Sequence, residues 1–152
     1  MAGSITVAVR KAVIEGLAAQ FAGTDPDISV TYGWQGSDDT AAREQIFTNN
    51  ARMEHSPAGM RAGRLYRDEA AEFDIVIAVL GVGMKPEETD ERATELGTVV
   101  EEFIADRKSN TLGVDGLNWI RVSGVALDYL IAPQKGSISN YTITVRYEAR
   151  LT

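Results

Sequence analysis

A short glycine motif, Gly81-Val82-Gly83, is the first place where the sequence could carry chemistry. It stands between a predicted buried strand and a predicted helix, where a dinucleotide-binding loop places its glycines against a pyrophosphate. The third glycine of that fingerprint should come three residues after Gly83, and Pro86 occupies the position. The acidic residue expected about 20 residues further on, at a strand end, would fall within a predicted helix. We therefore interpret the motif as a plain strand-to-helix turn.

The chain has one histidine, His55, and no cysteine, so it offers few residues for histidine- or cysteine-based catalysis or metal binding. A hydrolytic triad needs partners for its histidine, and zinc usually takes several His or Cys ligands. We predict neither site and interpret His55 as an exposed loop residue. The absence of cysteine also excludes a disulfide framework and is consistent with folding in a reducing cytoplasm.

Two acidic pairs, Asp25 with Asp27 and Asp38 with Asp39, could meet a calcium ion. They lack the spacing of an EF-hand loop, so we interpret them as solvated loop carboxylates. No pair of carboxylates is singled out for glycoside hydrolysis. The residues therefore predict no catalytic residue, no metal and no cofactor, and we expect a protein that is not an enzyme.

A basic group stands out in this acidic chain: Arg61, Arg64 and Arg67, with Met60 and Tyr66 among them. Arginine, tyrosine and methionine are enriched at protein interfaces and at the residues that contribute most to binding. The alternative is a solvated basic arm of a hairpin, since exposed charges contribute little to stability. Both interpretations stay open at this point.

The last stretch, residues 141–151, is the clearest structural element. Apolar Tyr141, Ile143, Val145, Tyr147, Ala149 and Leu151 alternate with polar Thr142, Thr144, Arg146, Glu148 and Arg150. This period of two predicts a β-strand with one face on a core and the other in water. Such a strand needs a sheet to pair with and a cover for its apolar face.

The preceding part of the chain is predicted to provide both the partner strands and the helices that cover the apolar face. We predict a helix over 5–21, a strand over 28–32, a second strand over 44–48, and a long loop over 53–63 that leads to a hairpin strand starting near Arg64. Residues 73–80 are apolar on both faces from Ile75 onward, which predicts a central strand covered on both sides, or on one side by a neighbouring subunit.

The second half continues with an amphipathic helix from Pro86 to about residue 108. In residues 117–132 the apolar positions change from even to odd numbers, which predicts a β-bulge at Ser123-Gly124. A turn over 133–140 then leads to the final strand. The prediction is a single domain over 1–152 of the α+β class, with a mostly antiparallel or mixed sheet of four to five strands and two helices packed on one face.

Composition narrows the function classes. No apolar run approaches the ~20 residues of a membrane span, and the N-terminus lacks the pattern of a secretion signal. The formal net charge of −7 argues against a protein that grips nucleic acid, because phosphate contacts need a basic surface.

Four segments in order along the chain resemble the tail terminator proteins of long-tailed bacteriophages. They are Val30-Thr-Tyr-Gly-Trp-Gln-Gly36, Arg43-Glu-Gln-Ile-Phe47, Gly59-Met-Arg-Ala-Gly-Arg64 with Arg67-Asp-Glu69, and Thr144-Val-Arg-Tyr-Glu-Ala-Arg-Leu151. The helix that follows Lys85-Pro-Glu-Glu fits the same pattern, and the resemblance covers nearly the whole chain.

The resemblance implies a structural protein of the virion, located at the head-proximal end of the tail and assembled in the host cytoplasm. Members of the family form a homohexameric ring that caps the tail tube, stops its elongation and joins it to the head–tail connector. The genome DNA passes through the ring without specific binding. Sheets face this channel and helices lie outside.

For this chain the resemblance gives two groups of residues a role. Met60, Arg61, Arg64, Tyr66 and Arg67 are expected at a subunit or tube interface, and the polar row Thr142, Thr144, Arg146, Glu148 and Arg150 is expected on the channel side. Another head–tail connector protein is the nearest alternative. A small α+β enzyme or ligand-binding domain that uses the Gly81–Gly83 turn or the 53–67 segment is the alternative from another class.

Overall fold

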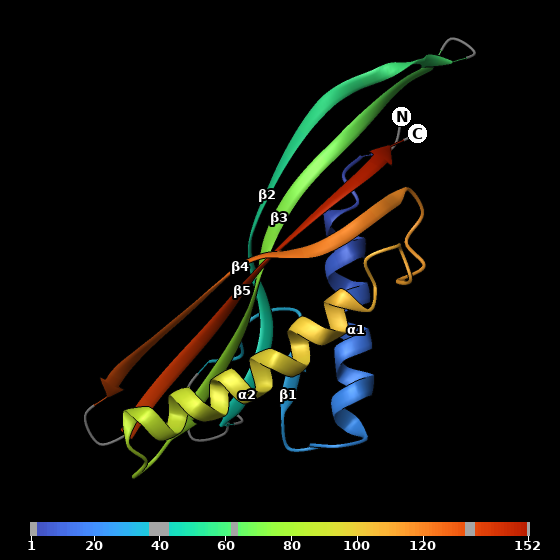
Figure 1. The fold of residues 1–152 in the computed structure, drawn as a ribbon. Coiled ribbons are helices and arrows are strands. Elements are labelled where there is room, and N and C mark those ends of the chain that lie inside the picture. The colour runs from blue at the N-terminus through green and yellow to red at the C-terminus, as the bar shows by residue number, and fades with distance from the viewer. Residues whose placement is uncertain (1–2, 37–42, 62–63, 133–135, 152) are drawn as a thin grey trace.

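The computed structural model describes residues 3–36, 43–61, 64–132 and 136–151, without the side chains of 58, 60, 61, 64, 65 and 132 (Figure 1). The elements in chain order are α1 (Thr6–Ala22), β1 (Ser29–Thr31), β2 (Glu44–Arg61), β3 (Arg64–Gly81), α2 (Pro86–Ala105), β4 (Leu117–Ala132) and β5 (Gly136–Leu151). The described strands form one sheet in the order β1-β2-β3-β5-β4, in which β1 is parallel to β2 and every other pair is antiparallel.

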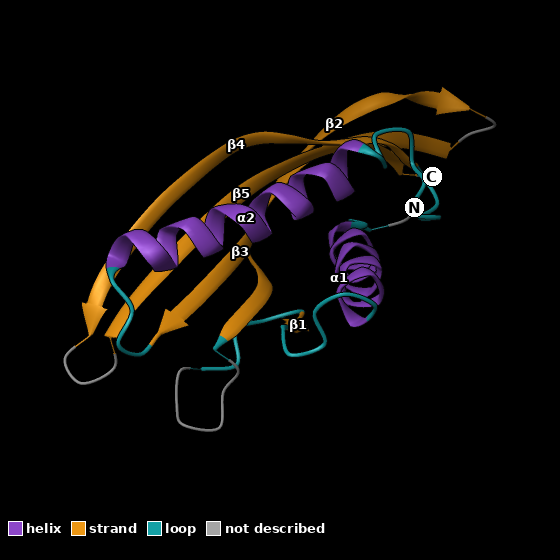
Figure 2. Cartoon of the chain, turned by 60° about the horizontal axis from the view of Figure 1, so that its bottom comes forward, coloured by secondary structure: helices purple, strands orange, loops and turns teal. Residues whose placement is uncertain are grey.

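Both helices pack against the same face of this sheet (Figure 2). Each contributes one stripe to the core: Val9, Val13, Leu17 and Phe21 from α1, and Ala93, Leu96, Val100, Phe103 and Ile104 from α2. The two helices also meet each other, since the position of a side chain at Gly16 would be filled by the ring of Phe103. The α+β class with two helices on one face is confirmed.

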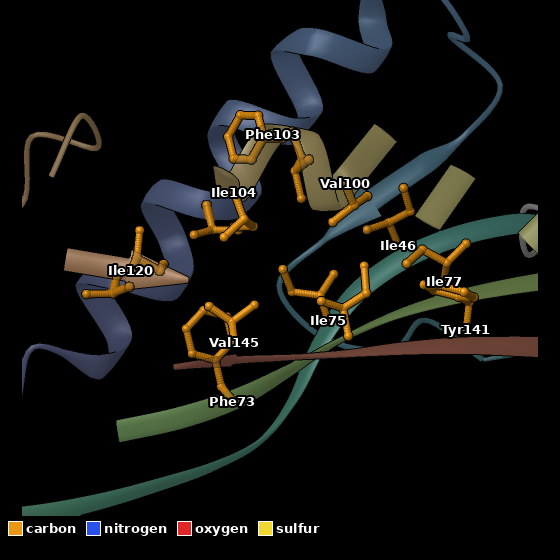
Figure 3. Close-up of a cluster of buried hydrophobic side chains, with 14 of the residues drawn as sticks. Ile46, Phe73, Ile75, Ile77, Val100, Phe103, Ile104, Ile120, Tyr141 and Val145 are labelled. Carbon is orange, nitrogen blue, oxygen red and sulfur yellow. The ribbon is translucent and has the colours of Figure 1, made fainter. Parts of the chain in front are cut away.

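The final strand is buried as its alternation predicts. Every odd-numbered residue from Tyr141 to Leu151 is less than a tenth exposed, and the even-numbered residues are not. The partner strand β3 follows the same rule, because Phe73 pairs with Val145 and Ile75 pairs with Ile143. Figure 3 shows Phe73, Ile75 and Val145 on the side of the sheet that faces Val100, Phe103 and Ile104 of α2. The core therefore forms between the helices and the odd-numbered face of the two long central strands.

The predicted bulge in β4 is also confirmed. Val122 pairs with Val145, and the next pair in the ladder joins Gly124 to Thr144, so Ser123 is the inserted residue. The insertion keeps Val122 and Val125 on the same face although their numbers differ in parity. The same logic explains why the apolar positions of this strand change from even to odd numbers.

The prediction of a long loop over 53–63 is wrong. β2 continues to Arg61 and β3 begins at Arg64, so these residues form a long hairpin. Two register shifts hide the strand pattern in the sequence, one after Asn49 and one after Pro57, with Asn50 and Gly59 at positive φ. Each inserted residue reverses which face the following side chains occupy, so no steady alternation is visible.

Pro57 is compatible with this strand because it lies on an edge. β1 pairs with β2 only over Gln45–Phe47, so the outer side of β2 beyond that point has no neighbouring strand among the described residues. A proline is tolerated on an edge strand and beside a bulge, and Pro57 directly precedes a register shift. We call residues 52–61 of β2 with 64–72 of β3 the hairpin arm; its outer part extends beyond β5, whose pairing with β3 begins at Arg67 (Figure 1).

Two boundaries differ from the prediction. The second helix ends at Ala105, and Arg107 beyond it donates to the carbonyl oxygen of Phe103 at 3.0 Å, which satisfies one of the last helical acceptors. The final strand begins at Gly136 rather than near residue 140, because the Ser-rich start of β5 already pairs with β3 and β4.

The close contact between α2 and the sheet gives a testable prediction. A Cβ atom at Gly97 would overlap the ring of the buried Tyr141. We expect Gly97→Ala to lower the free energy of unfolding by about 1–2 kcal/mol, although alanine normally stabilises a helix by about 1 kcal/mol relative to glycine. Urea denaturation measures this change.

Thr98→Ala is the matched control, because Thr98 is the exposed neighbour on the same helix. It should leave stability unchanged or slightly higher. An increase in stability for Gly97→Ala would contradict the close packing of α2 on Tyr141.

Candidate assembly surfaces

The basic group lies together at the tip of the hairpin arm. Arg61 pairs with Arg64 and Met60 pairs with Leu65 across the end of the hairpin, and Tyr66 and Arg67 follow at once on β3. The side chains of Met60, Arg61 and Arg64 lie outside the described residues. The backbone therefore presents all five residues at one projecting end of the molecule, and their interface role stays a prediction.

The arm is attached to the body of the domain by a buried carboxylate, Glu69. Its side chain is fully buried. Glu69 Oε1 accepts hydrogen bonds from the Tyr147 hydroxyl at 2.5 Å and from the Ile5 N–H at 3.2 Å. Glu69 Oε2 lies 2.6 Å from His55 Nε2, and the Tyr147 hydroxyl lies 2.6 Å from the Thr6 hydroxyl. One carboxylate thus joins β2, β3, β5 and the start of α1.

These contacts keep Glu69 ionised. Burial alone raises the pKa of the carboxyl group, but hydrogen bonds from Tyr147, Ser4, His55 and the Ile5 N–H outweigh it, and the pKa lies below its ordinary value. Burial and the same hydrogen bond raise the pKa of Tyr147, which therefore stays a hydroxyl donor. A group with a lowered pKa contributes stability above its unfolded pKa and loses it as the pH falls through the folded value.

The prediction that His55 is exposed is confirmed, but the prediction that it lies in a loop is wrong. His55 lies in β2, on the helix-covered side of the sheet, with its side chain 31% exposed and bonded to Glu69. The sequence did carry a signal for this site. Glu69 has the parity of Ala71, Phe73 and Ile75, so the period of two places a carboxylate on the buried face, where it requires donors.

The opposite face of the sheet carries the predicted polar row of β5, and both arginines of the row are paired with carboxylates. Arg146 lies 3.2 Å from Glu72, and Arg150 lies 3.0 Å from Asp68. Thr144 donates to Asp74 at 3.0 Å. These partners are neighbours on β3, so the pairs run straight across the strands. Thr142 and Glu148 belong to the same face, and we call the side without helices the open face.

At its other end the open face is apolar and hollowed. A groove of about 490 Å³ is lined by the apolar residues Trp34, Phe47, Val76, Leu80, Leu130 and Ile138 together with polar residues that include Arg43 and Asp128. Val76 and Leu80 are the residues that make residues 75–80 apolar on both faces. One face of this central strand is covered by helices, and the other lines the groove.

The remaining residues that the sequence analysis considered for ligand binding have structural roles or lie outside the described residues. Gly81–Gly83 forms the turn between β3 and α2, with Gly83 at a φ of 74° that favours glycine. Asp25 lies 3.8 Å from Arg92, and Arg92 also makes a two-pronged contact with Glu44. Asp38 and Asp39 lie outside the described residues. Within the described part of the chain, no three His, Asp or Glu side chains gather closely enough to hold a metal ion.

The comparisons with protein-family models and with curated proteins found no relative. No family model matches the chain, and no curated protein matches it significantly. Neither described helix has the combination of length and apolar content that crossing a membrane requires.

The buried carboxylate gives a second prediction. Glu69→Gln removes the charge that Tyr147 and His55 contact, so we expect a loss of about 2–3 kcal/mol of unfolding free energy at pH 7. Because the folded pKa of Glu69 is lowered, the deficit should shrink as the pH falls below the ordinary value of 4.5. Chemical denaturation across this pH range measures both effects.

Glu72→Gln on the same strand is the control. Glu72 is half-buried on the open face and pairs with Arg146, so its replacement should cost about 1 kcal/mol or less. Equal losses for the two variants, or a Glu69→Gln deficit that does not change with pH, would contradict the buried network.

Proposed function

We propose that this protein is a tail terminator of a long-tailed bacteriophage: a ring-forming structural protein that caps the tail tube, stops its elongation and joins it to the head–tail connector. The observation that carries the proposal is the division of the sheet into two unlike faces. Both helices cover one face, and no described helix lies on the other, where the even-numbered residues of β5 are half-buried or exposed. This division suits a ring whose sheets face a channel and whose helices lie outside.

The arrangement of charges on the open face supports the proposal that this face lines a channel through which DNA passes. Arg146 and Arg150, the two cations of the polar row, are each held by a carboxylate of β3. A paired guanidinium releases fewer counterions on meeting a phosphate, so it adds little to binding of DNA. The net charge of −7 acts in the same direction. A surface of this kind lets a polyanion pass without holding it.

The hairpin arm supports contact with neighbours in an assembly. It projects beyond β5 and ends in the basic group, while the rest of the chain is acidic overall. Residues 51–57 of β2 are exposed throughout. An extended arm that buries little of its own surface gains stability when it lies on another subunit or on the tube.

Experiments must distinguish the proposed function from two alternatives. Another head–tail connector protein of similar build would share these features and differ in the neighbour that it touches. A ligand-binding domain would use the groove near Trp34 or the Gly81–Gly83 turn. Saturable binding of a small molecule that is lost on changing Gly83 or His55 would favour it.

The proposed function is tested by mixing the purified protein with isolated tail tubes. We expect electron microscopy to show six-fold rings on one end of each tube, and tube elongation to stop when the protein is added to polymerising tube subunits. A protein that remains monomeric and never caps a tube would overturn the proposal.

The arm tip gives the third prediction. Arg61→Ala and Arg64→Ala should lower the fraction of capped tubes by about tenfold or more, because arginines at interface centres often contribute 2 kcal/mol or more to binding. Thermal unfolding of the subunit should change little. Lys11→Ala, at an exposed cation on α1, is the control. A loss of thermal stability as the main effect would show that the arginines serve folding rather than attachment.

A further inference from the structure

We propose that the free edge of β4 binds a second copy of this chain, and that the surface it meets is the opposite edge of the sheet, formed by β2 beyond β1. The subunits then join head to tail. This inference rests on the proposed ring and names the surfaces that build it.

The first observation is that β4 ends the sheet. Its inner side pairs with β5 over the length of the strand, and no described strand lies on its outer side. Near its start, the N–H of Ile120 donates to the carbonyl of Lys108 at 3.3 Å, so the segment before β4 covers that end. From Arg121 to Ile131 the outer edge faces no other strand in the described ranges.

The second observation is an apolar strip on this free edge. Val125, Leu127, Tyr129 and Ile131 share the helix side of the sheet and are 44–68% exposed, and Leu130 is 55% exposed on the other side. Among the side chains that the structure describes, half of the large exposed hydrophobic ones belong to this one strand segment. Natural edge strands are usually protected by lysine and other charged residues, or by proline. Residues 122–131 carry one charge, Asp128, so this edge is suited to being covered.

The third observation is the opposite edge. Beyond β1, no strand of the described residues lies beside the outer side of β2, and Met53 there is 45% exposed. Trp34, just after β1, is 62% exposed. Apolar surface is therefore exposed at both ends of the strand order. The other large hydrophobic residues that are exposed in the described part of the chain are Val7, Val82 and Met84.

Strand direction makes the two edges compatible. β4 is antiparallel to β5, β5 to β3, and β3 to β2, so β4 and β2 run in opposite directions. Copies related by rotation about a ring axis keep the same orientation. The β4 edge of one copy then meets the β2 edge of the next in the antiparallel sense, which allows hydrogen bonding or close packing.

The faces agree as well. Met53 and His55 lie on the helix side of β2, and Val125, Leu127, Tyr129 and Ile131 lie on the helix side of β4. Within one sheet Leu127 is level with Ile46 of β2, and Met53 is level with Ile120 of β4. The strip therefore meets Met53 of the neighbour when the strands are tilted to the ring axis, because tilted strands offset neighbouring copies along the strand direction. A two-fold contact of β4 with itself would cover the strip but leave Met53 and Trp34 exposed, and it would close a dimer instead of a ring.

Crosslinking tests this contact cleanly, because the natural chain contains no cysteine. Leu127→Cys and Met53→Cys are made as separate variants and also combined in one chain. They are treated with a short bismaleimide, both free at high concentration and assembled on tail tubes. We expect a covalent dimer when the two single variants are co-assembled, none from either alone, and a ladder of oligomers from the double variant.

Three outcomes would overturn the inference. A dimer from Leu127→Cys alone would mean that β4 meets β4. Assemblies without a crosslink in the mixed sample would mean that other surfaces meet. A chain that stays monomeric under both conditions would mean that the strip does not bind a second copy.

A charge on the strip gives a second readout. Leu127→Lys and Ile131→Lys should raise the concentration needed for assembly by about tenfold or more, measured by sedimentation velocity. Val7→Lys adds the same charge at a residue that is 59% exposed on α1 and should change it less than about twofold. Circular dichroism of the monomers checks that all three fold alike. Equal effects of the three variants would count against the strip.

Failure of the inference and failure of the proposed function are distinguishable. A crosslinked ladder from a protein that never caps tubes would retain the edge contact and overturn the terminator role. Capping rings without the crosslink between residues 53 and 127 would retain the role and overturn the contact.

Discussion

The register between β3 and β5 is the constraint on which the rest of the molecule depends. The two strands pair without a slip from Arg67–Leu151 to Gly81–Ser137. In a sheet, a shift of one residue turns every side chain to the other face. Here such a shift would move Val145 out of the core and Arg146 into it. The register therefore fixes in one step which side chains meet the helices and which form the open face.

The same register places the polar contacts. Glu69 and Tyr147 both fall on the buried face, two residues apart in the register of the two strands. This is close enough for the Tyr147 hydroxyl to donate to the carboxylate. Arg146 and Arg150 fall on the open face, directly opposite Glu72 and Asp68. A buried charge is tolerated only with several hydrogen-bond partners, and Glu69 has donors from three other elements. This contact connects the arm and the first helix to the regular part of the sheet.

Departures from the register give the molecule its projecting surfaces. The shifts after Asn49 and Pro57 let β2 and β3 continue as an arm beyond the body of the domain. The bulge at Ser123 gathers Val125, Leu127, Tyr129 and Ile131 on one side of an edge strand. The regular sheet thus provides stability, while the irregular positions determine the surfaces proposed to contact other subunits.

The amino-acid sequence by itself determined the elements with a steady period: the final strand, both helices and even the bulge in β4. It did so because burial on one face imposes a period of 2 or 3.6 residues that needs no knowledge of the partner. It did not determine the hairpin arm, since inserted residues near Asn50 and Gly59 break the alternation. Nor did it determine the partner of His55, because Glu69 is 14 residues away along the chain and reaches it only across a hairpin. The order of strands, and with it the free edge of β4, was decided by the tertiary structure alone, because local patterns describe each strand but not its neighbours.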